Sequence, residues 1–319
     1  MSGADSRIIP ETARFLTEEA KNMHTKIKDN LSGYFFIAPW LICFLVFTLF
    51  PVGMSLYYSF TDFNLLSAPD FIGLENYRYL LFEDRKFWQS VKVTLLYAFV
   101  SIPLRLIFAF FVANLLAKKH RGQGIYRTLF YLPSIVGESV AVAIVWRTIF
   151  GKNGAFEALL GAMGITTEYS VLGDPSTAIW SLILMSIWQF GSPMLIFLAG
   201  LKDIPDVYYE AASIDGASSF QKFWRITVPL ITPIFLFNLV MQMITGFMVF
   251  TQGYIITEGG PLNSTLFYVV YLYQTTFENF ESGRGSAMAW LLLAFIGILT
   301  AILFSTSKYW VFEENEKEG

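Results

Sequence analysis

Long apolar runs alternate with short polar segments along most of this chain of 319 residues. Six runs reach about 20 residues or more, the length that a helix needs to cross the hydrocarbon core of a bilayer. They lie at 34–60, 91–117, 126–150, 177–200, 228–251 and 287–311. The pattern predicts an all-α membrane protein with six transmembrane helices. We expect a cytoplasmic leader at 1–33, a transmembrane domain at 34–311 and a short cytoplasmic tail at 312–319.

Composition supports this interpretation and excludes several other classes. Hydrophobic residues make up 55% of the chain and charged residues only 15%, and a soluble domain could not hide so much apolar surface from water. The net charge of -3 gives no basic patch for nucleic acid. Cys43 is the single cysteine and the two histidines are far apart, so we expect no disulfide within the chain and no metal site.

The distribution of basic residues predicts the orientation. Five lysines and arginines precede the first run, and Lys118, Lys119, Arg121 and Arg127 crowd the link between the second and third runs. Because short cytoplasmic segments are enriched in such residues, both regions are expected inside. Six spans then place both termini, and the polar segment 201–227 between the fourth and fifth runs, on the cytoplasmic side.

That polar segment has an unusual pattern. From Glu210 to Pro229 it reads EAASIDGASSFQKFWRITVP, which is too polar to cross hydrocarbon. A short helix is expected after Pro205, over 206–213, because no residue there breaks a helix. Asp215 and Gly216 predict a turn, and a second short helix should run from Ala217 and end before Pro229.

The spacing within this segment resembles the EAA loop of binding-protein-dependent ABC importer permeases. The motif is EAA, three residues, Gly216, nine residues, Ile226, one residue and a final Val228-Pro229, with Val228 where the family usually has leucine. The resemblance implies a type I importer permease fold, and a loop that projects into a groove of an ATPase subunit. The residues that would form this coupling contact are Glu210, Ala211, Ala212, Asp215 and Gly216.

Three further stretches are similar to the carbohydrate branch of that family, which includes the maltose and glycerol-phosphate permeases. They are YRTLF at 126–130 with Leu132-Pro133, LAGLKDIPDVYYEAASIDGAS at 198–218, and Gly259-Gly260-Pro261. The resemblance implies a second, related but different permease chain, two ATPase subunits and an extracytoplasmic solute-binding protein. It also implies a multi-pass location, surrounded by lipid, in a bacterial or archaeal cytoplasmic membrane.

The chain has no nucleotide site of its own. A phosphate-binding loop needs GxxxxGK followed by Ser or Thr, and Gly151-Lys152-Asn153 does not meet that pattern. We therefore expect no cofactor on this chain and no enzymatic activity, with ATP and Mg²⁺ bound by a separate ATPase.

Polar side chains within two apolar runs are candidates for a solute path. A sugar needs hydrogen-bonding groups together with aromatic faces in a water-filled cavity. The candidates are Ser186, Trp188, Gln189 and Ser192 in the fourth run, and Asn238, Gln242, Thr245 and Gln252 in or after the fifth. The alternative is that they form hydrogen bonds between helices, as such residues commonly do in membranes.

Two charged residues lie deep within apolar runs. At 1.5 Å per residue, Arg105 is roughly 20 Å from Lys118, and Glu138 is roughly 16 Å from Arg127 on the next run. Similar depth on neighbouring antiparallel helices favours an ion pair between them, because an unpaired charge there would be costly. The alternative is that Arg105 faces the cavity and favours an acidic sugar.

Together with these patterns, the family resemblance implies the membrane subunit of an ATP-driven importer that moves a carbohydrate, as an oligosaccharide, by alternating access. A polyol or a phosphorylated glycerol is the alternative solute. A channel or a membrane sensor is the alternative class, but a channel needs no ATPase-docking loop.

Overall fold

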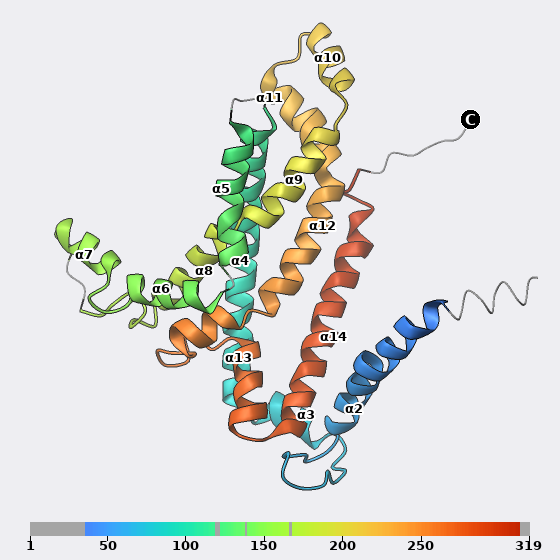
Figure 1. Ribbon diagram of the computed structural model, residues 1–319, viewed down its shortest axis with the longest axis vertical. Coiled ribbons are helices and arrows are strands. Elements are labelled where there is room, and N and C mark those ends of the chain that lie inside the picture. Colours follow the sequence, from blue (N-terminus) through green and yellow to red (C-terminus); the bar gives the residue numbers. More distant parts are fainter. Residues whose placement is uncertain (1–35, 119–121, 138, 166–167, 313–319) are drawn as a thin grey trace, which may run out of the picture. The chain divides into compact units, whose positions relative to one another are not determined.

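The computed structural model describes residues 36–118, 122–137, 139–165 and 168–312 (Figure 1). The predicted leader at 1–33 and nearly all of the predicted tail lie outside these ranges. Within them the chain is helical, and the only strand-like pairing is an isolated antiparallel bridge between Thr61 and Phe71. The chain divides into two compact units, Met1–Tyr57 and Tyr58–Gly319, which are taken separately below.

The first unit contributes one long apolar helix, Phe36–Tyr58, of 23 residues. It includes a π-helical turn, η1 (Leu45–Leu49), followed by α2 (Phe50–Tyr58). The wider turn comes just before Pro51, whose ring would otherwise collide with the preceding helical turn. None of the most apolar stretch is buried within the chain, as expected for a helix in contact with lipid or another membrane subunit.

The second unit is arranged around α4 (Arg85–Ala117), a helix of 33 residues. Asp84 caps it by accepting hydrogen bonds from the backbone N–H groups of Lys86 and Phe87. It packs against α8 (Ala178–Trp188), α9 (Gly191–Asp203) and α12 (Val228–Phe247). Small residues such as Ala109 and Ala113 are fully buried in this core, which allows close helix packing. The final long helix, α14 (Ser282–Ser307), contacts α12.

The predicted run at 126–150 is not one straight helix. It divides into α5 (Gln123–Val136) and α6 (Val140–Phe150), and the chain bends by 92° between Gln123–Val136 and Val140–Ala162. Ser139 caps α6 by accepting a hydrogen bond from the N–H of Val142, so a helix stop and restart are encoded inside the apolar run. The described chain therefore has five helices that are long and apolar enough to cross a membrane, and six if this bent pair counts as one span. α7 (Ala155–Ala162) follows α6.

The polar segment between the fourth and fifth runs forms the two short helices and the turn that the sequence predicts, which together we call the elbow. α10 (Asp206–Ile214) is followed by Gly216 with φ of 77°, and then by α11 (Ser219–Lys222). The Nζ atom of Lys222 donates to the Ser213 hydroxyl at 2.5 Å, which ties the two helices together.

The prediction that the second helix ends before Pro229 is wrong. α11 continues through a π-helical turn, η2 (Phe223–Thr227), into α12 without a break. Pro229 lies at the start of α12 within this continuous helix, and the wide η2 turn makes room for its ring.

The remaining short elements lie at the end of the second unit opposite α10 and α11 (Figure 1). They are α3 (Glu75–Phe82), which packs on α14, η3 (Gly253–Thr257), α13 (Tyr268–Tyr273) and η4 (Gln274–Glu278). With α10 and α11 on the cytoplasmic side, as the basic residues predict, these elements lie on the outer side.

Candidate functional site

A cavity of about 350 Å³ lies between α4, α8 and the C-terminal end of α12. Its wall combines polar groups with aromatic rings, the mixture that the sequence predicted for a sugar path. The polar residues that line it are Ser101, Arg105, Ser186, Gln189, Gln242, Thr245, Thr251 and Gln252. Tyr97 and Phe250 contribute the aromatic rings.

Arg105 lies in this wall and joins three helices. Its Nε atom donates to the carbonyl oxygen of Ser186 at 2.6 Å, and one terminal nitrogen donates to Oε1 of Gln242 at 2.6 Å. A guanidinium group has only donors, so the Gln242 amide must turn its oxygen toward it. The amide nitrogen of Gln242 is then left as a hydrogen-bond donor. Glu138, the predicted partner of Arg105, lies outside the described residues, and that ion pair stays a prediction.

The other predicted path residues divide into two groups. Ser186, Gln189, Gln242, Thr245 and Gln252 all reach the cavity. The remaining three occupy other positions and do not line it. Trp188 packs against Trp146, with ring centroids 5.6 Å apart, and the N–H of Ser192 donates to the Ser134 hydroxyl. Asn238 is fully buried, and neither of its amide atoms has a hydrogen-bond partner within the described ranges.

Sequence reasoning missed two residues of α4, Tyr97 and Ser101, that line the cavity. Tyr97, Ser101 and Arg105 are four residues apart, so they share one face of that helix, and this face borders the cavity. The spacing was visible in the sequence. Of the three residues, only Arg105 was a candidate, because the alternative to its pairing with Glu138 placed it facing the cavity.

Two helix breaks meet beside the cavity. One separates α8 from α9 at Gln189 and Phe190, and the other separates α5 from α6. The Ser134 hydroxyl donates to the carbonyl of Gln189 at 2.8 Å, and it accepts from the N–H of Ser192 at 3.1 Å. In return, Nε2 of Gln189 donates to the carbonyl of Gly137 at 2.9 Å. Each break thus satisfies backbone groups that the other leaves without an intrahelical partner.

The backbones approach closely at this point. A Cβ atom added at Gly191 would lie 2.7 Å from the carbonyl oxygen of Phe130, which leaves no room for a larger residue. Gln189 therefore has contacts on two sides, the cavity and the break in the α5–α6 pair. The geometry links the cavity wall to α9, the helix that leads directly to the elbow.

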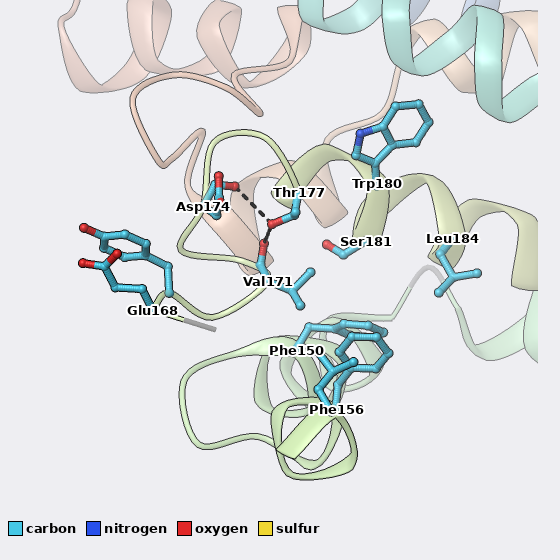
Figure 2. A pocket seen from close by; sticks show the side chains of 11 residues that line it. Phe150, Phe156, Glu168, Val171, Asp174, Thr177, Trp180, Ser181 and Leu184 are labelled. Atoms are coloured by element: carbon cyan, nitrogen blue, oxygen red, sulfur yellow. Dashed lines mark hydrogen bonds between the residues drawn. The ribbon is translucent and has the colours of Figure 1, made fainter. Parts of the chain in front are cut away.

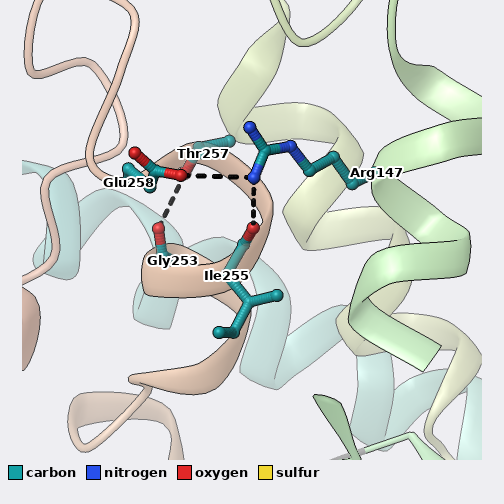
Figure 3. A network of polar contacts seen from close by, with 5 residues as sticks. All are labelled: Arg147, Gly253, Ile255, Thr257 and Glu258. Carbon is teal, nitrogen blue, oxygen red and sulfur yellow. Dashed lines mark hydrogen bonds and ion pairs between the residues drawn. The ribbon is translucent and has the colours of Figure 1, made fainter. Parts of the chain in front are cut away.

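Arg147 connects α6 to η3 and to Glu258, the residue that follows η3 (Figure 3). One terminal nitrogen of its guanidinium lies 3.2 Å from the carbonyl oxygen of Ile255 and 3.2 Å from Oε1 of Glu258. The two side chains are 55% and 67% exposed, so the ion pair adds at most about 1 kcal/mol.

A second, larger cavity of about 670 Å³ lies between the α6–α7 arm and the beginning of α8 (Figure 2). Phe150, Phe156 and Trp180 line it, together with Asp174. The Ser176 backbone N–H and hydroxyl donate to the Asp174 carboxylate and lower its pKa. None of the predicted path residues borders this space. The cavity between α4, α8 and α12 is therefore the candidate solute site.

The elbow presents an acidic and apolar surface. Glu210, Ala211, Asp215 and Gly216 are exposed, and Ala212 is half-buried. Next to them, Ile214 is 87% exposed and Phe220 is 73% exposed. Large apolar side chains this exposed on one projecting elbow are typical of a surface that another protein covers.

Comparison with known proteins gives a consistent result. Residues 85–313 match the family model described as "Binding-protein-dependent transport system inner membrane component". The chain is 55% identical over 293 residues to the probable ABC transporter permease protein YesP of Bacillus subtilis, which covers 91% of this chain and 95% of that protein. It is 32% identical to the multiple sugar-binding transport system permease protein MsmF of Streptococcus mutans, over 89% and 97% of the two chains.

A solved structure has the same fold. It belongs to a bacterial ABC transporter involved in the import of the acidic polysaccharide alginate, and it superposes with a TM-score of 0.74 at 21% sequence identity. The match covers 90% of this chain and 98% of the other.

Proposed function

This chain belongs to the binding-protein-dependent transport system inner membrane component family, among permeases of ABC sugar importers, and we propose that it carries an oligosaccharide across the cytoplasmic membrane by alternating access. Its relatives and its fold are those of transporter subunits rather than enzymes. The observation that carries the proposal is the cavity between α4, α8 and α12, because its wall joins amides, hydroxyls and aromatic rings from three apolar helices.

The cavity suits a sugar for a physical reason. Hydroxyl groups at the edge of a sugar ring need both donors and acceptors, and the Gln189, Gln242 and Gln252 amides each provide one of these or both. The C–H faces of the ring pack on aromatic surfaces, which Tyr97 and Phe250 provide. The hydrogen bond from Arg105 holds the Gln242 amide in one orientation, which lowers the entropy cost of binding a solute.

The elbow would transmit the energy of ATP hydrolysis to this chain. Glu210, Ala211, Ala212, Asp215 and Gly216 would contact a separate ATPase subunit, with the exposed Ile214 and Phe220 inserted into its surface. When two ATPase subunits close on ATP and Mg²⁺, the elbow would move and pull α9 and α12 with it. The hydrogen bonds between Ser134, Gln189 and Gly137 would carry this movement to the cavity wall.

The complete importer would contain partners on both sides of the membrane. A second, related permease would complete the path, and an extracytoplasmic solute-binding protein would deliver the sugar to the outer elements. One structure with this fold is of an alginate ABC transporter in complex with a pentasaccharide-bound periplasmic protein, which supports such an arrangement.

A second candidate solute is an acidic or phosphorylated one, such as a uronic-acid sugar or phosphorylated glycerol. The observation that favours it is the guanidinium of Arg105 in the cavity wall, which would attract an anion. A neutral polyol is also compatible with the amides of the wall.

The test is reconstitution of the full complex in proteoliposomes with its ATPase, second permease and binding protein. Neutral ladders of gluco- and xylo-oligosaccharides and an acidic ladder of galacturono-oligosaccharides, each of two to six units, would be offered as solutes. We expect at least one ladder to stimulate ATP hydrolysis and to accumulate inside the vesicles. Glu210→Ala and Gly216→Pro should leave membrane insertion intact and abolish this stimulation. Absence of stimulation by every ladder would contradict the proposed function.

A further inference from the structure

Four aromatic rings follow one another from the cavity toward the outer end of the second unit. We call them the aromatic strip: Phe250, Tyr254, Tyr273 and Phe277. The Phe250 ring is 5.1 Å from Tyr254 and 5.2 Å from Tyr273, measured between centroids. Tyr273 is in turn 5.1 Å from Tyr254 and 5.2 Å from Phe277. Because Phe250 also lines the cavity, the strip begins at the cavity wall.

The strip leads away from the elbow. Phe250 follows the outer end of α12, and Tyr273 and Phe277 belong to α13 and η4, which lie at the end of the unit opposite α10 (Figure 1). Phe277 is 55% exposed, and the other three rings are partly exposed. The aromatic surface thus continues from a half-enclosed cavity to an open face.

The exposed parts of these four rings are not needed to pack the elements around them. Phe250 and Tyr254 pack against the core of this region, which includes the fully buried Phe267 and Val270, but both rings remain partly exposed. Phe277 contributes little to that core, since more than half of its surface is exposed.

Polar groups accompany the strip. The hydroxyl of Tyr254 donates to Oε1 of Glu278 at 3.1 Å, and this hydrogen bond raises the pKa of Tyr254. Glu278 is exposed, so its carboxylate can also accept hydrogen bonds from a solute. Aromatic faces flanked by hydrogen-bond acceptors are suited to a chain of sugar rings. The C–H faces of the sugars pack on aromatic rings, and their hydroxyl groups form hydrogen bonds.

The size of the cavity gives the strip a role. At about 350 Å³ it is near the lower limit of about 300–1,000 Å³ for ligand pockets, so an oligosaccharide of several units would extend beyond it. We propose that the aromatic strip is an extended sugar-binding site, which holds the outer units of a linear oligosaccharide while its leading units occupy the cavity. This inference rests on the proposed function and adds the class of solute: a linear chain longer than the cavity.

The experiment measures how the effect of each variant depends on chain length. With the reconstituted complex and one unchanged binding protein, ATP hydrolysis is titrated with two-unit and six-unit members of the ladder that stimulates wild type most strongly. Phe277→Ala and Tyr273→Ala should raise the half-saturating concentration of the six-unit sugar by up to about tenfold, the loss expected for one or two aromatic contacts. The two-unit sugar should show no change. Tyr273→Phe, which keeps the ring, should behave as wild type for both.

The control is Phe82→Ala, which removes an aromatic side chain that is 82% exposed on α3, outside the strip. It should leave both titrations unchanged. An equal shift of the half-saturating concentration for short and long sugars, or no shift for either in Phe277→Ala, would refute the sugar-binding role of the aromatic strip. The proposed importer function would stand. If Tyr273→Ala does not assemble, Phe277→Ala alone decides, because an exposed ring contributes little to folding. If no ladder stimulates wild type, the strip and the proposed function are refuted together.

Discussion

Gly216, at the turn of the elbow, allows a prediction with a magnitude that follows from the structure. Its φ is +77°, a conformation that residues other than glycine rarely adopt. A Cβ atom added there would meet nothing within 4 Å, so a small side chain would cause no collision. The cost of Gly216→Ala is therefore the backbone cost alone, about 1–2 kcal/mol for an L-residue in the left-handed region.

That free-energy cost should weaken the coupling between this chain and the ATPase, and the loss should grow with the cost. If the elbow must hold this turn to engage the ATPase, about 1–2 kcal/mol lowers the engaged population by about 5- to 30-fold relative to other conformations. Gly216→Asn should lose least, because asparagine tolerates the left-handed region. Gly216→Val should lose most, because it is β-branched.

The assay is sugar-stimulated ATP hydrolysis by the reconstituted complex, with basal hydrolysis and subunit stoichiometry measured in the same samples. The matched control is Gly297→Ala in α14, where a Cβ also meets nothing within 4 Å but the backbone is helical. That change should leave stimulation unaltered. Equal stimulation in the Asn, Ala and Val variants at Gly216 would refute the argument that this turn is under conformational constraint during coupling.

Three other sites give shorter predictions. Gly191→Ala places a Cβ 2.7 Å from the Phe130 carbonyl oxygen and should lower the free energy of unfolding by about 1–3 kcal/mol. The loss would be measured as a lower melting temperature in detergent. An unchanged melting temperature would contradict the close packing of α5 and α9. Gln242→Leu removes the acceptor that Arg105 uses and should raise the half-saturating sugar concentration, whereas Gln242→Glu should retain that contact with Arg105; equal titrations for Leu and wild type would exclude a role in binding. Arg147→Ala should change the free energy of unfolding by no more than about 1 kcal/mol, since the Glu258 contact is exposed, and a larger loss in urea unfolding would show that the outer loop depends on it.

Much of the architecture could be predicted because the hydropathy pattern shows which segments can lie within a membrane. The long apolar helices and the polar elbow follow from run length and charge, and the turn at Gly216 follows from glycine beside Asp215. Five of the eight polar residues proposed for the path do line one cavity, because polar side chains in apolar helices turn toward each other or toward water.

Other features could not be read from hydropathy because they depend on contacts between distant residues. The break after α5 lies inside an apolar run, and its backbone groups are satisfied by Gln189, which is 52 residues away from Gly137. Pro229 was expected to end a helix, but a local π-helical turn absorbs it. The depth of Arg105 indicated a buried partner, yet its position within the chain could not show that Ser186 and Gln242 would accept its hydrogen bonds.

The central claim is that the elbow formed by α10 and α11 is the contact between this chain and an ATPase. The most direct measurement is cross-linking from Asp215→Cys in a background with Cys43→Ser, so that the elbow carries the chain's single cysteine. In inside-out vesicles that contain the whole complex, a reagent that joins cysteine to lysine should link this chain to the ATPase subunit, and sugar with ATP should change the yield. Labelling of the cysteine only from the outer side of the membrane, or no ATPase adduct under any condition, would contradict the claim.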